Sequence, residues 1–151
     1  MSTHVPSKDP LLSPFVIGNR VIKNRIFSSG HALSHAVNGR ATPTTLNYQK
    51  EKALGGIGLS FVGGSGTVSP DTAPVFDQLV IDDHIVPFFQ ELSAFYHRHD
   101  ALLLTQITHL GRRTHSNAGE WVPIVAPSAI RETLHRGFPR EMDEADIFRL
   151  V

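Results

Sequence analysis

The sequence has no cysteine among its 151 residues. A disulfide framework, a thiolate metal site and a thiol nucleophile are therefore excluded. Its 14 basic and 14 acidic residues cancel, so no overall charge attracts nucleic acid or an anionic membrane surface. No apolar run approaches the roughly 18 residues that a membrane-spanning helix needs. We therefore expect neither nucleic-acid binding nor membrane binding.

The first ten residues also lack the basic and then apolar pattern of a secretory signal. This favours a cytoplasmic protein, although a chain without cysteine fits secretion almost as well. Nine histidines are a high number, but they form no HExxH pattern. His97 and His99 are two apart, so on a helix their side chains point in different directions. No metal site is predicted.

Three short apolar segments are predicted to be strands, and each ends in small or polar residues. They cover residues 25–29, 58–63 and 101–106. The residues that follow or end them are Ser28-Ser29-Gly30-His31, Gly63-Gly64-Ser65-Gly66 and the stretch from Gln106 to Arg113. Short unbroken apolar runs of this kind are typical of buried parallel strands.

Two predicted helices separate these strands. Thr42 and Pro43 begin the first, which ends at Leu54 before two glycines. Asp82 and Asp83 precede the second, which runs from about residue 85 to 99 with apolar side chains three and four apart. The order β-α-β-α-β predicts an α/β fold with adjacent parallel strands. Ligands of such folds bind at the carboxyl ends of the strands.

The rest of the chain is less regular. A small hairpin is predicted over Phe15–Ile22, with Gly18 and Asn19 at its turn. We expect it to lie near the amino ends of the strands. After the third strand we expect a loop of about thirty residues that contains Trp121, and such loops are usually functional. A helix capped by Asp143 then begins, and the sequence ends about two turns later. We interpret the chain as truncated at its carboxyl end.

Four features together resemble the old yellow enzyme family, the FMN-containing NADH:flavin oxidoreductases. They are the hairpin Pro14-Phe15-Val16-Ile17-Gly18 with Val21-Ile22-Lys23-Asn24-Arg25, the Gly55-Gly56-Ile57-Gly58-Leu59 strand entry, the Gln106-x-x-His109-x-Gly111-Arg112 motif, and Ala126-Pro127-Ser128 with Pro139-Arg140-Glu141-Met142. The resemblance covers nearly all 151 residues. It implies that the chain is the amino-terminal part of a (β/α)8 TIM barrel, with about three of the eight strands.

The resemblance also implies a cofactor and a set of residues that bind it. The segment Ser28, Ser29, Gly30 and His31 would line one side of the flavin, largely through backbone atoms. Gly64 matches a small residue near the flavin, and Gln106 matches the glutamine that binds its pyrimidine edge. An amide suits that edge because it offers both a donor and an acceptor. Ser28–His31 looks closest to the branch with dienoyl-CoA reductases and amine or N-methylproline demethylases.

In such an enzyme, hydride passes between NAD(P)H, FMN and a small-molecule substrate, either an unsaturated carbonyl compound or an N-methyl amine. The family's substrate-binding pair, the arginine near the flavin and its phosphate loops would lie beyond Val151, and so would any iron–sulfur cluster. The catalytic residues and the oligomeric state are therefore unknown, and we expect the chain alone to be inactive. The alternative is a complete small α/β module that binds a ligand or partner without catalysis.

Some residues stay open at this level. His109 is as consistent with a structural hydrogen bond as with catalysis. Arg112 and Arg113 favour loop anchoring over substrate binding. His31 either lies beside the flavin, which we favour, or fills space left by Gly30.

Overall fold

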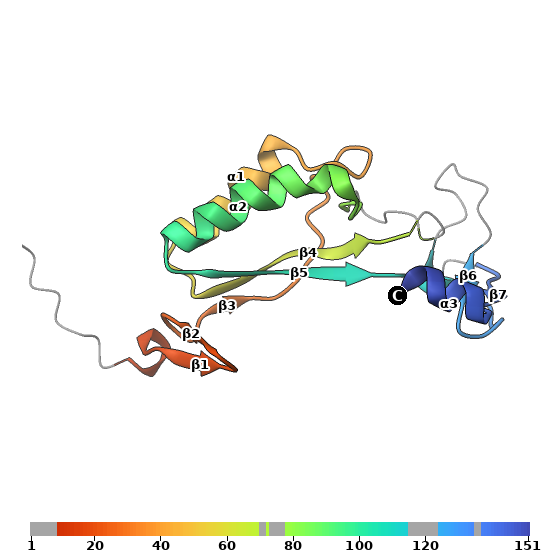
Figure 1. The fold of residues 1–151 in the computed structure, drawn as a ribbon, viewed down its shortest axis with the longest axis horizontal. Helices are drawn as coiled ribbons and strands as arrows, with labels where there is room; N and C mark the ends of the chain where they lie inside the picture. Colours follow the sequence, from red (N-terminus) through yellow and green to blue (C-terminus); the bar gives the residue numbers. More distant parts are fainter. Residues whose placement is uncertain (1–8, 70–71, 73–77, 115–123, 135–136) are drawn as a thin grey trace, which may run out of the picture.

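The computed structural model describes residues 9–69, 72, 78–114, 124–134 and 137–151. At its centre lies a parallel sheet in the order β3-β4-β5 (Figure 1). The strands are β3 Phe27–Ser28, β4 Leu59–Thr67 and β5 Leu102–Thr108. Both neighbouring pairs are parallel, with Phe27 opposite Leu59 and Leu59 opposite Leu102. The three predicted strands are thus confirmed as adjacent and parallel.

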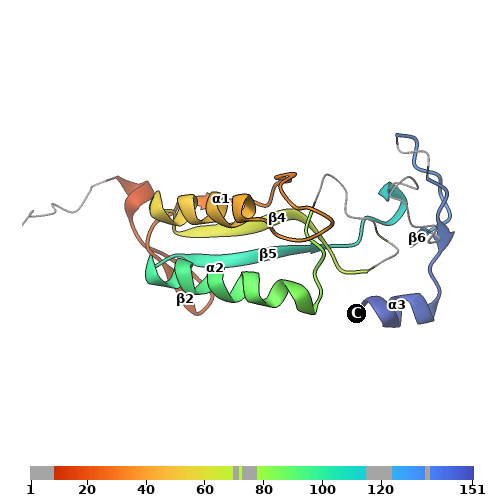
Figure 2. The same cartoon turned by 90° about the horizontal axis from the view of Figure 1, so that it is seen from above.

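Two helices cover one face of this sheet, as Figures 1 and 2 show from two directions. They are α1, Pro43–Leu54, and α2, Val86–Arg98. The Thr42 hydroxyl accepts a hydrogen bond from the backbone of Thr45, so the predicted cap of α1 is confirmed. Asp82 instead caps a short 3-10 turn, η2 Asp83–Ile85, that precedes α2.

The core lies between the helices and the sheet. Leu92 and Tyr96 of α2 have no exposed surface, and Val62 of β4 is 1% exposed. The Tyr96 hydroxyl donates to the backbone carbonyl of Gln49 on α1 at 2.8 Å, which joins the two helices. The predicted apolar face of α2 is therefore present, with the addition of Tyr96.

The predicted hairpin is also confirmed. Strands β1, Phe15–Ile17, and β2, Arg20–Ile22, pair antiparallel after a short 3-10 turn, η1 Pro10–Leu12. The hairpin lies near the amino ends of the sheet strands (Figure 1). Just after it, the Lys23 ammonium donates to the carbonyl of His99 at the end of α2.

An open hollow of about 390 Å³ lies between the hairpin and the sheet. Its lining includes Phe15 from the hairpin and Phe27 and Phe61 from the strands. Phe27 is 61% exposed. The hollow lies on the side of the sheet away from α1 and α2, where the hairpin covers the sheet only in part (Figure 1).

The stretch after β5 is more ordered than predicted. It contains a 3-10 turn, η3 Gly111–Arg113, and two short strands, β6 Val125–Ala126 and β7 Arg140–Glu141, that pair in parallel. The predicted thirty-residue loop is wrong in this respect, because the apolar residues Val125 and Ala126 are buried and need a pairing partner for their backbone. Trp121 lies outside the described residues. Helix α3, Glu144–Leu150, follows with Asp143 as its cap, as predicted.

The bounds of all three strands also differ from the prediction, and β3 is limited to Phe27–Ser28. β4 continues through Gly63–Gly66 to Thr67, and β5 continues through Gln106 to Thr108. The glycines are therefore part of a strand and not a loop. The pairing shifts register between Val62 and Gly66, where Gly63 has a φ of +70° that glycine adopts freely. The glycine run makes an irregularity in the strand and does not end it.

Candidate functional site at the carboxyl ends of the strands

The predicted site residues lie around the carboxyl ends of β3, β4 and β5. Ser28 is the last residue of β3, and Ser29, Gly30 and His31 follow it. Gly64 lies in β4 after the register shift, and Gln106 lies in β5. The parallel pairing brings these segments, which are far apart in the sequence, to one edge of the sheet.

Gly30 and Gln106 are in direct contact. A methyl group at Gly30 would collide with Oε1 of Gln106 and lie 2.7 Å from the carbonyl oxygen of Gly63. Only glycine leaves room for this approach. The structure therefore joins the end of the first sheet strand to the glutamine of the third.

Gly64 packs on the backbone of the same segment. A methyl group there would lie 2.6 Å from the carbonyl carbon of His31 and 3.0 Å from its Cα. Any side chain at Gly64 would push His31 and β4 apart. Gly64 thus fixes how close the segment lies to the sheet.

The Gln106 side chain is exposed. Among the residues that the structure describes, none forms a hydrogen bond with its amide. Both a donor and an acceptor are therefore available at the strand end, as the edge of a flavin ring requires. The chemistry of this amide is compatible with the polar edge of an FMN ring.

The side chains of Ser28 and His31 contact helix α1. The Ser28 hydroxyl accepts a hydrogen bond from the Lys52 ammonium at 3.0 Å. The imidazole of His31 bonds through Nδ1 to the Ser29 carbonyl at 3.0 Å and through Nε2 to the Tyr48 hydroxyl at 2.9 Å. The segment would therefore face a ligand mainly with its backbone.

Tyr48 and Lys52 were not identified from the sequence. They are four residues apart on α1, so they share one face of the helix. Burial lowers the pKa of the Lys52 amine from its ordinary value. The spacing alone could have placed the two side chains together, but not against the end of β3.

His109, Arg112 and Arg113 belong to the turn after β5. The Nδ1 atom of His109 accepts a hydrogen bond from the backbone N–H of Gly111 at 3.1 Å. This contact supports the structural interpretation of His109. Arg112 and Arg113 are exposed.

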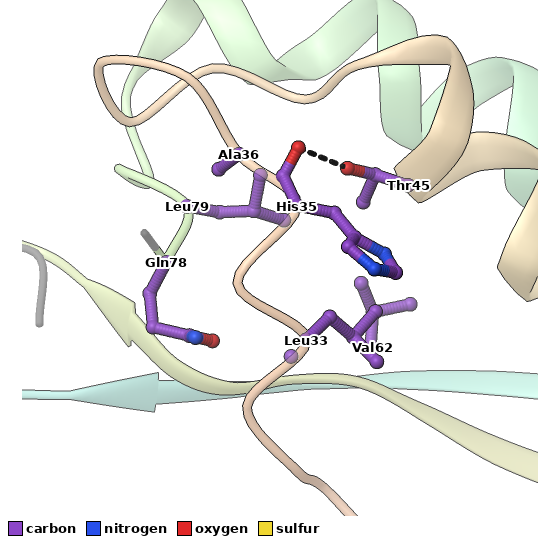
Figure 3. A pocket seen from close by; sticks show the side chains of 8 residues that line it. Leu33, His35, Ala36, Thr45, Val62, Gln78 and Leu79 are labelled. Atoms are coloured by element: carbon purple, nitrogen blue, oxygen red, sulfur yellow. Dashed lines mark hydrogen bonds between the residues drawn. The ribbon is translucent and has the colours of Figure 1, made fainter. Parts of the chain in front are cut away.

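A second cavity lies beside the segment after His31 (Figure 3). Its volume is about 10 Å³, which is close to the space of a single water molecule. His35 lines it, and the carbonyl of His35 accepts hydrogen bonds from the hydroxyls of Thr42 and Thr45. The cavity is too small for a flavin or substrate.

The described residues contain neither a metal-binding group nor a membrane-spanning helix. No three histidine, aspartate or glutamate side chains in that part of the chain form a group that could hold a metal ion. No helix there is long and apolar enough to cross a membrane.

Solved structures with a similar fold include enzymes of the old yellow enzyme type. A 2-naphthoyl-CoA reductase bound to 2-naphthoyl-CoA aligns with a TM-score of 0.81 at 24% identity, over 93% of this chain and 23% of that one. An old yellow enzyme homologue from Zymomonas mobilis aligns with a TM-score of 0.76 at 23% identity, over 94% of this chain and 42% of that one. These alignments confirm the predicted fold, the amino-terminal part of a TIM barrel.

Curated relatives are more similar in sequence. The chain is 42% identical over 146 residues to a multifunctional alkene reductase/demethylase of Caballeronia cordobensis, over 96% of this chain and 22% of that protein. It is 38% identical over 144 residues to a probable N-methylproline demethylase of Rhizobium meliloti, over 95% of this chain and 21% of that protein. The chain thus spans about a fifth of the length of these relatives.

The names of these relatives agree with the branch expected from the sequence. Residues 10–151 match the model of a family described as NADH:flavin oxidoreductase / NADH oxidase. FMN and NAD(P)H are the cofactors of this family, as predicted. Because the match extends over nearly all of its residues, the chain belongs to the NADH:flavin oxidoreductase / NADH oxidase family.

Proposed function

We propose that this chain provides one wall of the FMN site of an NAD(P)H-dependent oxidoreductase. The observation that supports this most is the contact between Gly30 and Gln106 at the carboxyl ends of parallel strands. The segment after β3 and the carboxyl end of β5 are brought together there, and the Gln106 side chain is exposed.

In this proposal the residues have distinct roles. Gln106 donates to and accepts from the polar edge of the ring. Gly64 and Gly30 keep the neighbouring backbone close and free of side chains. Ser28, Ser29 and His31 fix the path of the segment that the ring would face. FMN, when bound, would supply hydride transfer between NAD(P)H and the substrate.

We further propose that the substrate is a small molecule, either an unsaturated carbonyl compound or an N-methyl amine. The relatives named as an alkene reductase/demethylase and a demethylase support this choice. A cytoplasmic location stays a prediction from the sequence.

The test is made on the natural full-length protein, purified from cells. We expect it to contain FMN and to catalyse NAD(P)H oxidation with an enone, or flavin reduction by an N-methyl amino acid. Folded protein that contains no flavin and binds none on titration would overturn the proposal. Such a result would favour the alternative, a binding module without catalysis.

A further inference from the structure

Helix α1 holds both ends of the Ser28–His31 segment. Lys52 donates to the Ser28 hydroxyl at 3.0 Å, and Tyr48 bonds to Nε2 of His31 at 2.9 Å. The Lys52 ammonium also lies 4.7 Å from the centre of the Tyr48 ring. The rings of Tyr48 and His31 meet edge to face, with centres 5.8 Å apart. A single face of the helix thus contacts the start and the end of the segment.

These contacts determine where the proton of His31 lies. The Ser29 carbonyl can only accept, so Nδ1 of His31 must be protonated to bond to it. In the neutral ring Nε2 is then an acceptor, and the Tyr48 hydroxyl donates to it. The Nδ1–H donor in turn holds the Ser29 carbonyl in one direction.

Tyr48 has close neighbours on more than one side. The Lys52 ammonium lies over its ring, 4.7 Å from the centre. On its other side Tyr48 meets the ring of His35 edge to face, with centres 5.9 Å apart. Tyr48 therefore lies between two imidazoles and beneath an ammonium, and its hydroxyl is directed at His31.

We propose that Tyr48 and Lys52 are positioning residues that fix the Ser28–His31 segment before a flavin binds, with His31 held as the Nδ1–H tautomer. The importance of this segment for flavin binding rests on the proposed function. A segment fixed in advance loses less conformational freedom when the ligand arrives, so the ligand binds more tightly.

The first experiment needs no flavin. Nitrogen-15 NMR of the histidine-labelled, flavin-free full-length protein at about pH 8, where an ordinary imidazole is neutral, shows which ring nitrogen of His31 is protonated. We expect only the Nδ1–H form in the wild type and a mixture of both tautomers in Tyr48→Phe. The matched control is Tyr96→Phe, which removes the hydroxyl that donates to Gln49 and should leave His31 unchanged. A wild-type His31 in the Nε2–H form would overturn the proposal, and so would a Tyr48→Phe spectrum equal to wild type.

The second experiment compares two changes of the lysine. Lys52→Met should increase amide hydrogen exchange at Ser29, Gly30 and His31, whereas Lys52→Arg should restore protection because it keeps a charged donor. Equal exchange in both variants would contradict a positioning role for Lys52.

The flavin-loaded protein provides the last readout. Tyr48→Phe and Lys52→Met should each weaken FMN binding by about two- to tenfold, the effect of losing one hydrogen bond. If neither the wild-type protein nor any variant binds FMN, but the His31 spectra are as expected, the proposed function fails and the positioning role stands. Unchanged FMN affinity in Tyr48→Phe would overturn the link between positioning and binding.

Discussion

At the scale of single residues, two glycines decide how closely the strand ends approach. Gly64 lies against the backbone of His31, where a methyl group would have to displace main-chain atoms. Overpacking of this kind costs typically about 1–3 kcal/mol. We expect Gly64→Ala to lower the free energy of unfolding by that amount, measured by urea titration. It should also weaken flavin binding, measured by titration with FMN.

The control for Gly64→Ala is Gly55→Ala. Gly55 has an ordinary φ of −67°. The atom nearest to a methyl group added there would be the carbonyl oxygen of Glu51, at 3.3 Å. A change within about 1 kcal/mol is expected there. If the two variants are equally stable, the close contact at Gly64 has no energetic importance.

Residue types at strand ends were predictable, but their side-chain partners were not. Gly30, Gly64 and Gln106 could be placed at one edge because parallel strands align their carboxyl ends. The direction of the His31 side chain depends on Tyr48, which is 17 residues away. No spacing rule relates a strand end to a particular turn of the following helix.

At the scale of elements, the Thr42 cap should stabilise the first turn of α1. The Thr42 hydroxyl accepts the Thr45 backbone N–H at 3.2 Å. Thr42→Ala should cost about 1 kcal/mol, measured by urea unfolding. Thr44→Ala, an exposed change in the same first turn, is the control and should have a smaller effect. Equal losses would show that the cap does not stabilise α1.

Helix α3 should be sensitive to acid. The backbone N–H of Asp143, and then the Arg140 guanidinium at 2.7 Å, hold the pKa of Asp146 below its ordinary value. Because the folded pKa is depressed, this stabilisation is present above the unfolded pKa of about 3.9 and is lost as pH falls through the folded value. We expect Asp146→Asn to reduce the acid-dependent loss of α3 helicity, followed by circular dichroism between about pH 5 and pH 2.

Glu144→Gln is the control for the acid experiment, because Glu144 is an exposed acid in the same turn. It should leave the pH dependence near that of wild type. A curve for Asp146→Asn that matches wild type would contradict the role assigned to Asp146.

The order of elements was more predictable than their exact ends. Alternating strands and amphipathic helices specify the parallel sheet and the covering helices. The extension of β4 through its glycines was missed because pairing with β5 stabilises a backbone whose residues disfavour strands. The β6–β7 pair was missed because two-residue strands have no periodicity to detect.

At the scale of the whole molecule, the described residues cover one face of the sheet only in part and provide no strand that pairs with the outer edge of β5. Phe27 is 61% exposed and Ile107 is 63% exposed. Open strand edges and apolar faces favour association between chains. The 151-residue chain alone should therefore bind FMN weakly or not at all and should aggregate, as gel filtration and absorbance would show. A monomeric yellow protein with stoichiometric FMN would contradict this expectation.

The most direct test of the flavin site is a change at Gln106 in the flavin-loaded protein. Gln106→Leu removes both the donor and the acceptor, which should cost about 1–3 kcal/mol. That loss corresponds to an FMN affinity roughly five- to a hundredfold lower. The midpoint potential should also fall, because the lost donor stabilises negative charge on the reduced ring. Gln106→Glu should be worse because it places a carboxylate near that charge.

Arg113→Ala is the matched comparison, since Arg113 lies in the turn after β5 and is exposed. The measurement is the FMN dissociation constant and midpoint potential of all three variants and wild type. We predict a large change in both quantities for the Gln106 variants and a small one for Arg113→Ala. If Gln106→Leu equals wild type in both quantities, Gln106 does not contact the flavin and the proposed site is wrong.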